Sequence, residues 1–520
     1  MQREKLGLTL GPLFLIILLL LPPLPGTELV TQKFGVNPFS ISVALGVLLW
    51  TATWWITECV PLGLAALIPP IVFGFVGIVD WKTSLMLFMH PIIWIFMAGF
   101  VFTKAFQKWG LDKRIALKLA LLYKGDDPKL SAFFSVALPA FLLTFTGSIT
   151  AATSIVFPIA IAYLATLGNQ KDSKFDEAVM LLLGQAATVG AMLLLISTPP
   201  NLIGKSVLEQ SILDLVEKGL LPQTFKDFSL SFFDWFIVGT PQAIIGLIIV
   251  WITVFWVLKP ELGTVKIDRE QMIENLRRLG SMSLQEKVVL SVFILTVILW
   301  IIPGLLLIVS NFMPEYKFLS SLVKKVLPEA APAALSIFLL GLIKIKEQNI
   351  LTWEDIERGI DWNVVFLFGG GLALGKGLDS SGFSLWLGES IMSLTGNQLN
   401  VFTITFISAF LGFLITYPAS NTASTVIAAP IASSISIAAG INPLPAVIAT
   451  VLACSISSAL PSTTPPMAIV YGSKKIKLIN MFKLGMIADT LRLIVLLITI
   501  PYLSEFLLEL KGLPLYIGGR

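Results

Sequence analysis

The sequence predicts an all-α polytopic membrane protein, with about eleven transmembrane helices plus two re-entrant hairpins in an inverted two-fold repeat. Composition is the first reason. Of the 520 residues, 56% are hydrophobic and only 13% are charged, whereas soluble proteins carry about 25% charged residues. The second reason is a set of long apolar runs, and the third is an internal duplication. So few charges cannot cover an ordinary water-facing surface.

The apolar runs are long enough to cross a bilayer, which takes about 20 residues per helix. The clearest runs are 8–21, 41–55, 60–79, 237–258, 288–307 and 487–507. The N-terminal stretch MQREKLGLTLGPLFLIILLLL has the basic start and apolar run of a signal peptide. No A-x-A-like cleavage site follows it, so we predict an uncleaved first span.

The placement of basic residues predicts the orientation in the membrane. Lys and Arg gather in 104–129, 259–287 and 474–483. With a cytoplasmic N-terminus, most Lys and Arg residues fall on the cytoplasmic side, as the positive-inside rule requires. We therefore predict a multi-pass protein of the cell membrane with a cytoplasmic N-terminus. Lys104 and Lys376 are interpreted as side chains that reach the membrane interface.

The duplication relates two polar stretches within apolar surroundings. TFTGSITAATSIVFPIA (144–160) matches TYPASNTASTVIAAPIA (416–432) at nine of 17 positions, 272 residues apart. The same spacing relates Phe96 to Phe368, Gly99 to Gly371, Lys104 to Lys376 and Gly110 to Gly382. STPPNLI (197–203) matches TTPPMAI (463–469), 266 residues apart. The charged segment 259–287 joins the halves and is predicted to be a cytoplasmic linker. Inverted repeats of this kind are common in secondary transporters.

The repeated motifs predict two hairpins and two broken helices. Residues 131–165 and 399–439 each have an apolar arm, a Ser/Thr tip and a second apolar arm. In hydrocarbon such a segment must be buried in protein, because every backbone polar group needs a partner. The Pro-Pro pairs predict breaks at 197–201 and 463–466. Tip hydroxyls at helix N-termini make an anion site, and tip oxygens suit a small hard cation.

The four motifs carry no Lys, Arg, Asp or Glu. A dianion held there at mid-membrane would lack counter-charge, and burying unpaired charge is expensive. Bound cations beside the anion would balance it. The motifs therefore favour cation-coupled anion transport.

These residues resemble the divalent anion/sodium symporter (DASS) family of the ion transporter superfamily. The resemblance rests on WWITECVPLGLAALIPP (54–70), FMAGFVFTKAFQKWGLDKRIALKLA (96–120), SNT (420–422), STPPN (197–201) and LPSTTPPMAIV (460–470). It implies a homodimer in which a transport domain moves as an elevator against a scaffold. By that division, 1–105 and 288–375 form the scaffold, and 106–258 and 376–520 form the transport domain.

The resemblance also implies the ligands, a small dianion such as a C4-dicarboxylate, citrate or sulfate, with Na⁺ as the coupling ion. Substrate would contact Ser148, Thr150, Ser420, Asn421 and Thr422, with Thr198-Pro199 and Thr464-Pro465 closing the site. One sodium would lie near Thr144, Ser148 and the Ser197 carbonyl, and the other near Thr416, the Ala419 carbonyl, Asn421 and the Thr463 carbonyl.

The chain departs from the family pattern at two positions. Ile149 stands where the family usually has Asn, and Met467 stands where Asn is common. The Ile149 side chain offers neither an amide to substrate nor an oxygen to sodium, although its backbone carbonyl could still bind a cation. This departure bears directly on the first sodium site and on the stoichiometry.

Alternatives remain open at this point. A sodium-independent anion exchanger or a proton-coupled carrier of dicarboxylate, citrate or sulfate would keep the fold and change the coupling. A cation/proton antiporter usually needs an intramembrane carboxylate, which neither tip has. A membrane enzyme would need acid pairs, metal-ligand clusters or a nucleophile with a base, and the chain has one His. A channel suits paired proline breaks less well. No feature indicates a nucleic-acid partner, and we expect no organic cofactor and no enzymatic activity.

Overall fold

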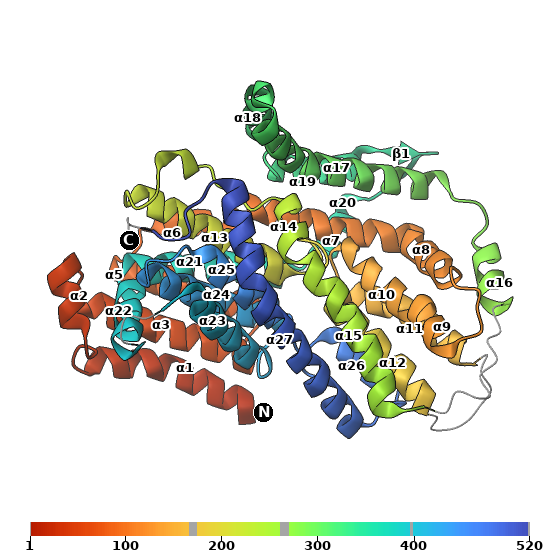
Figure 1. Ribbon diagram of the computed structural model, residues 1–520, viewed down its shortest axis with the longest axis horizontal. Coiled ribbons are helices and arrows are strands. Elements are labelled where there is room, and N and C mark those ends of the chain that lie inside the picture. Colours follow the sequence, from red (N-terminus) through yellow and green to blue (C-terminus); the bar gives the residue numbers. More distant parts are fainter. Residues whose placement is uncertain (1, 166–173, 261–269, 396–398, 518–520) are drawn as a thin grey trace.

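The computed structural model describes residues 2–165, 174–260, 270–395 and 399–517, and within these ranges it is built of helices (Figure 1). The described part has one small sheet, in which β1 (Lys344–Ile345) pairs antiparallel with β2 (Gln348–Asn349). The all-helical class predicted from the composition is confirmed. The predicted linker 259–287 lies partly outside the described residues.

The first half contains α1 (Gln2–Leu20), α2 (Thr27–Phe34), α3 (Pro38–Thr57), α4 (Leu62–Ala65), α5 (Ile68–Val76), α6 (Trp81–Met86), η1 (Leu87–Met89), α7 (Pro91–Trp109), α8 (Leu111–Ala120), α9 (Pro128–Ala132), η2 (Phe133–Ala137), α10 (Leu138–Leu142), η3 (Leu143–Thr146), α11 (Ile149–Ala165), α12 (Lys174–Gly190), α13 (Pro199–Glu217), η4 (Gln223–Phe225), α14 (Phe232–Val238) and α15 (Thr240–Leu258).

After α16 (Glu270–Arg278), the second half contains α17 (Leu284–Phe312), η5 (Pro314–Tyr316), α18 (Lys317–Val326), α19 (Ala330–Leu342), α20 (Trp353–Gly359), α21 (Trp362–Ser380), α22 (Phe383–Thr395), α23 (Val401–Thr416), α24 (Asn421–Ala438), α25 (Pro443–Cys454), α26 (Pro465–Tyr471) and α27 (Leu478–Lys511).

Several helices suit a bilayer by length and composition. Within the described residues, six are long and apolar enough to cross a membrane, namely Pro38–Thr57, Trp81–Trp109, Pro128–Thr146, Thr240–Leu258, Leu284–Leu306 and Leu478–Lys511. Shorter apolar helices are Leu62–Val76, Ile149–Leu164, Ala330–Leu342, Val401–Thr416 and Pro443–Cys454. The membrane class follows, and the number of about eleven crossings stays a prediction.

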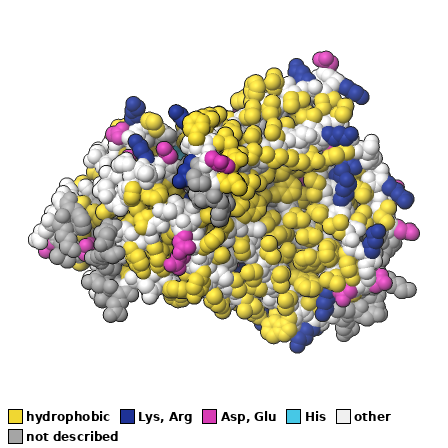
Figure 2. Space-filling view, turned by 45° about the horizontal axis from the view of Figure 1, so that its top comes forward, with side chains coloured by type: hydrophobic (Ala, Val, Ile, Leu, Met, Phe, Trp, Pro, Cys, Tyr) yellow, Lys and Arg dark blue, Asp and Glu magenta, His cyan; other side chains and the backbone are white. Residues whose placement is uncertain are grey.

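The molecular surface supports the same class. Figure 2 shows one face covered largely by hydrophobic side chains, with Lys and Arg lying along its right-hand edge and at its upper left. Large apolar side chains are exposed on the long helices, such as Ile252 and Trp256 on α15, Ile294 and Ile298 on α17, and Ile498 on α27. Soluble monomers rarely expose apolar patches this broad. Lipid is the environment in which these side chains are stable.

The two halves of the chain interleave in the core. Helix α7 of the first half packs against α19 of the second, α12 against α26, α15 against α27, and α13 against α24 and α25. In Figure 1 the long dark-blue α27 accordingly runs beside the yellow-green α15. Neither half buries its apolar faces alone. Whether the halves are inverted copies of each other stays a prediction.

Both predicted hairpins form as helix, tip and helix. The first runs from α9–η3 through Gly147 and Ser148 into α11, and the second from α23 through 417–420 into α24. Ser148 and Ser420 begin the second arms, because each hydroxyl accepts a hydrogen bond from the backbone N–H three residues on. This is the N-cap arrangement expected of Ser. The helices that correspond to the predicted ranges 131–165 and 399–439 span 128–165 and 401–438. That these hairpins are re-entrant stays a prediction.

The helix breaks lie upstream of their predicted positions. Helix α12 ends at Gly190 and α13 begins at Pro199, so the unwound stretch is 191–198 and not 197–201. Likewise α25 ends at Cys454 and α26 begins at Pro465, so the second break is 455–464 and not 463–466. The prolines form the first turn of the second helix, where their missing N–H has no partner to lose. They begin a helix, and the chain unwinds before them.

The repeated glycines have structural roles at the hairpins. Gly147 has a φ of +97°, and a Cβ placed there would lie 3.2 Å from the Cα of Gly99 on α7. In the second half a Cβ on Gly371 of α21 would lie 2.5 Å from the side chain of Val426 on α24. Glycine at positions 147 and 371 therefore permits one helix of each half to approach its hairpin closely.

Candidate functional site

Four oxygen atoms converge at the second hairpin tip. The Thr416 Oγ1 lies 2.8 Å from the Asn421 Oδ1 and 2.7 Å from the Cys454 carbonyl oxygen. The Ser457 Oγ lies 2.8 Å from the same Asn421 Oδ1 and 3.4 Å from Thr416 Oγ1. Thr416, Cys454 and Ser457 are fully buried, and Asn421 is nearly so. The tip and the second helix break thus meet in one group of oxygens. We call the oxygens of Thr416, Asn421, Cys454 and Ser457 the second oxygen cluster, because they lie at the second hairpin tip.

The second oxygen cluster has too few hydroxyl protons to make a hydrogen bond at each of its close oxygen–oxygen contacts. Thr416 and Ser457 bring one hydroxyl proton each, and the Asn421 Oδ1 and the Cys454 carbonyl only accept. The Thr416 hydroxyl faces two acceptors at hydrogen-bond distance and can donate to only one of them. A cation at the cluster would relieve this crowding of lone pairs. Neutral hydroxyl, amide and carbonyl oxygens are ligands that suit a hard cation such as Na⁺.

The first tip has an equivalent but poorer cluster. The Thr144 Oγ1 lies 2.8 Å from the Gly190 carbonyl at the end of α12 and 2.7 Å from the Phe141 carbonyl. Thr144 matches Thr416 in the repeat, and Gly190 ends its helix as Cys454 does. Ile149 occupies the place of Asn421 and brings no side-chain oxygen. The asymmetry between SIT and SNT is therefore a difference in the number of side-chain oxygens at the two tips.

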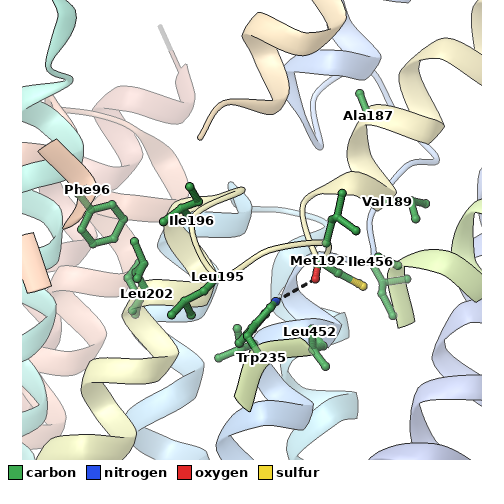
Figure 3. Packing of buried hydrophobic residues seen from close by; sticks show 14 of the residues in the cluster. Phe96, Ala187, Val189, Met192, Leu195, Ile196, Leu202, Trp235, Leu452 and Ile456 are labelled. Carbon is green, nitrogen blue, oxygen red and sulfur yellow. Dashed lines mark hydrogen bonds between the residues drawn. The ribbon is translucent and has the colours of Figure 1, made fainter. Parts of the chain in front are cut away.

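The carbonyls of the first break accept hydrogen bonds from three side chains of the protein. The Asn201 amide donates to the carbonyls of Ala191 and Leu194, at 2.7 and 3.0 Å. The Trp235 indole N–H donates to the Met192 carbonyl at 2.9 Å, as the dashed line in Figure 3 shows. The Thr240 hydroxyl donates to the Leu193 carbonyl at 2.7 Å. The backbone carbonyls of an unwound stretch inside a membrane protein need hydrogen-bond donors. These hydrogen bonds hold the first break in the conformation of this structure.

A buried charged pair on α27 forms hydrogen bonds with the second tip and with the second break. Asp489 and Arg492 on α27 are 0% and 3% exposed, and their side chains lie 3.2 Å apart. Asp489 accepts from the Tyr417 hydroxyl at 2.9 Å and from the Ser458 N–H at 2.6 Å, and Arg492 donates to the Ser455 carbonyl at 3.3 Å. Our sequence reasoning missed this pair. The signal was present, because ionisable residues inside an apolar run are functional candidates.

A polar cavity of about 330 Å³ opens beside the first tip. Its lining includes Ser148, which precedes α11, Thr150 of α11, Lys104 of α7 and Arg358 of α20. The prediction that Lys104 reaches the membrane interface stays a prediction. Its place beside the first tip was not predicted, because spacing along one helix does not show what a distant hairpin brings beside it. Ser148 and Thr150 are brought together with a cationic side chain. Ser420, Asn421 and Thr422 do not line this cavity.

The remaining predicted site residues lie at the two breaks and the second tip. Thr198 and Thr464 precede the second helices with extended backbones, and the Thr464 hydroxyl lies 3.2 Å from that of Thr188 on α12. The Ser197 hydroxyl accepts from the Leu194 N–H at 3.1 Å. The Thr463 hydroxyl donates to the Leu460 carbonyl, and Ala419 is 5% exposed at the second tip. Pro199 and Pro465 open α13 and α26.

Among the described residues, the acidic side chains do not form a metal-binding cluster at the tips or breaks. Within the described ranges, no three His, Cys, Asp or Glu side chains are placed to hold a metal ion. The oxygen clusters at the tips therefore offer neutral ligands only. Such ligands suit a monovalent cation that must bind and leave, better than a tightly held divalent ion.

This arrangement defines a class of protein, namely a helical membrane transporter with paired hairpin tips and paired helix breaks. The particular family follows from comparison with known proteins. The family model for the sodium:sulfate symporter transmembrane region matches residues 11–509. The chain belongs to this family, and the resemblance to the divalent anion/sodium symporters is confirmed.

Curated relatives span nearly the whole chain. The sodium-dependent dicarboxylate transporter SdcS of Staphylococcus saprophyticus subsp. saprophyticus is 31% identical over 516 residues, covering 96% of this chain and 91% of the relative. SdcS of Staphylococcus aureus (strain USA300) is 32% identical over 522 residues, covering 97% and 92%. Among solved structures, the Alcanivorax borkumensis YdaH transporter aligns with a TM-score of 0.51 at 14% identity, covering 84% of this chain and 89% of that one. The last similarity concerns the fold alone.

Proposed function

We propose that this chain is a secondary active transporter that moves C4-dicarboxylates (succinate, malate or fumarate) together with Na⁺ across the cell membrane. The family is a family of sodium symporters, and the curated relatives are named sodium-dependent dicarboxylate transporters. The chemistry of the tips agrees with both partners, because helix N-termini suit carboxylates and neutral oxygens suit Na⁺.

The single observation that carries the proposal is the second oxygen cluster. Thr416 faces both Asn421 and Cys454 at hydrogen-bond distance with one proton to share. A sodium ion there would be held by the tip and the break at once. It would also lie beside Asn421, which we assign to the substrate carboxylate. Binding of the cation and the anion would then favour each other, and this linkage is what symport requires.

Substrate would bind at the N-termini of α24 and α11. Ser420, Asn421 and Thr422 open the first of these helices, and Ser148 and Thr150 open the second. The partial positive charge of each helix start would stabilise a carboxylate. Thr198-Pro199 and Thr464-Pro465 would close the site from the two breaks.

We assign one sodium to each tip. The second site would comprise Thr416, Asn421 and the carbonyls of Ala419 and Thr463, and the cluster adds the Cys454 carbonyl and Ser457 to this set. The first site would comprise Thr144, Ser148 and the carbonyls of Ile149 and Ser197. The first site has the smaller set of side-chain oxygens, so its occupancy is the less secure part of the assignment of two ions.

The proposed movement is of the elevator type. Residues 106–258 and 376–520 would form the moving transport domain, and 1–105 and 288–375 the scaffold that holds a homodimer together. The N-terminus would be cytoplasmic. The interleaving of the two halves is compatible with this division, because the tips and breaks of both halves then belong to the moving domain.

Uptake into proteoliposomes tests the function. We expect labelled succinate to accumulate under an inward sodium gradient and not under an equal potassium gradient. Failure of succinate, malate, citrate and sulfate alike to accumulate would exclude the proposal. A second candidate, anion exchange or proton coupling, is favoured by the missing side-chain oxygen at Ile149. Sodium-independent counterflow against internal succinate would select exchange, and accumulation driven by a proton gradient would select proton coupling.

A further inference from the structure

Lys104 and Lys376, which occupy equivalent positions in the repeat, differ in whether an acidic side chain among the described residues lies beside them. Lys376 on α21 lies 3.1 Å from Asp214 on α13, and nearby Lys218 lies 2.9 Å from Asp379. All four line one cavity of about 90 Å³, so two positive charges face two negative ones. Lys104 is the repeat partner of Lys376 on α7. Among the hydrogen bonds and ion pairs of the described residues, its ammonium group takes part in none.

The surroundings of Lys104 leave it as an uncompensated positive charge. Its stem packs against Gly359, and it lines the 330 Å³ cavity beside the first tip. The other cation in the lining, Arg358, is paired with Glu354 at 2.7 Å, and 76% of its side chain is exposed. A half-buried ammonium with free donors in a polar cavity is positioned to attract an anion.

The first tip contributes anion-binding groups to the same cavity. Ser148 and Thr150 stand at the start of α11, where the helix end is partially positive. Thr103, the neighbour of Lys104, donates to the Thr146 carbonyl at 2.6 Å. This bond joins α7 to the tip in the conformation of this structure, so Lys104, at the end of the proposed scaffold segment 1–105, lies beside the tip hydroxyls in this state of the transport domain.

The two halves of the chain differ in the neutralisation of their repeated lysines as well as in the side-chain oxygens of their tips. The second tip has the Asn421 oxygen, and the repeat lysine Lys376 of α21 lies beside Ser433 and Ser434, farther along α24, where Asp214 neutralises it. The first tip has Ile149, and Lys104 lines the cavity at the tip itself. We propose that Lys104 binds one carboxylate group of the substrate at the first tip, and that it supplies there as a fixed charge what a bound cation would otherwise supply. This inference rests on the proposed function. It predicts that the second tip provides the main sodium dependence.

Succinate binding to the purified full chain tests the inference. Isothermal titration calorimetry would compare Lys104→Gln, Lys104→Arg and Lys118→Gln, the last being an exposed lysine on α8, at saturating sodium. We expect Lys104→Gln to weaken succinate binding about tenfold, since it removes a charge-assisted bond, and Lys104→Arg to weaken it less than about threefold. Lys118→Gln should bind as the wild type. The thermal midpoint without ligand would confirm that each variant is folded.

A double variant separates a charge role from a packing role. Ile149→Asn restores a side-chain oxygen at the first tip, so Lys104→Gln/Ile149→Asn should regain affinity only in sodium and show a steeper sodium dependence. Equal succinate affinity of Lys104→Gln and wild type would overturn the inference and leave the proposed function standing. A lowered thermal midpoint with unchanged affinity would overturn it as well. If the wild type binds none of succinate, malate, citrate and sulfate, the proposed function fails and the inference fails with it.

Discussion

The hydroxyl of Thr416 lies 2.7 Å from the carbonyl oxygen of Cys454, so the tip of the second hairpin touches the last turn of α25 at the point where that helix unwinds. The first half repeats the contact, with Thr144 2.8 Å from the carbonyl of Gly190 at the end of α12. In both halves a tip threonine therefore bonds a carbonyl that the helix break has freed. A ligand bound at either contact would sense the tip and the break together.

Asn421→Ala should remove sodium binding at the second tip. The substitution takes away the Oδ1 atom that Thr416 and Ser457 both approach at 2.8 Å. We expect sodium-driven succinate uptake to fall by on the order of a hundredfold or more, because both an ion ligand and a substrate donor are lost. The stabilisation of the purified protein by sodium, measured as a thermal shift without substrate, should fall with it.

Asn400→Ala serves as the matched control, because Asn400 caps the outer end of α23 in the same hairpin. Loss of that cap should lower stability by about 1 kcal/mol and leave the sodium-induced shift intact. A full sodium shift in Asn421→Ala would remove the assignment of the second oxygen cluster to sodium.

The sequence was sufficient to locate the tips, because duplication marks them and Ser at a helix start has a local physical reason. It was not sufficient to place the breaks, since a Pro-Pro pair equally ends one helix and begins another. Ser457, the carbonyl of Cys454 and the cavity at Lys104 could not be predicted, because each depends on a contact between segments far apart in the chain. Asp489 and Arg492 were visible as charges in an apolar run, but their partners were not.

Arg492→Met should be one of the most destabilising substitutions in the chain. It would leave Asp489, which is fully buried, without its cationic partner, and breaking a buried pair from one side typically costs about 3–5 kcal/mol. The double variant Asp489→Asn/Arg492→Met should recover part of the loss, since no unpaired charge remains. Thermal unfolding in detergent measures both. Equal stability of Arg492→Met and wild type would show that the pair is not held buried in solution.

Lys205→Met should destabilise the contact between the two halves of the chain. The ammonium of Lys205 on α13 lies 2.5 Å from Glu209 and 2.8 Å from Glu329, which precedes α19, and it is 2% exposed. Without it two carboxylates face each other in a buried place, so we expect a loss of several kcal/mol. Glu329→Gln should cost less, because Glu209 still pairs with the lysine. If the two variants had equal thermal midpoints, Lys205 would not be the centre of this cluster.

Asp355 on α20 provides a pH test. Burial raises its pKa, but hydrogen bonds from Lys108 and Thr352 outweigh burial and lower the pKa to about 2. A lowered pKa means that the contribution to stability is present above the ordinary value of 3.8 and is lost as the pH falls through about 2. Asp355→Asn should therefore cost up to ~1 kcal/mol, constant between about pH 5 and pH 8. A loss of stability that disappears between those pH values would contradict the pairing of Asp355 with Lys108. Glu354→Gln is the control, because Glu354 forms an exposed ion pair with Arg358.

Gly147→Ala should disrupt the first tip far more than an equivalent change nearby. Gly147 has a φ of +97°, and the added Cβ would lie 3.2–3.3 Å from backbone atoms of Gly99, which cannot move aside as a flexible side chain can. Gly110→Ala is the matched control, because Gly110 has a φ of +70° with no atom within 4 Å of its Cβ position. The control should lose about 1 kcal/mol from backbone strain alone, and Gly147→Ala should lose clearly more and also weaken succinate binding, since the tip carries Ser148 and Thr150. Equal losses in the two variants would mean that α7 and the tip do not pack this closely in the membrane.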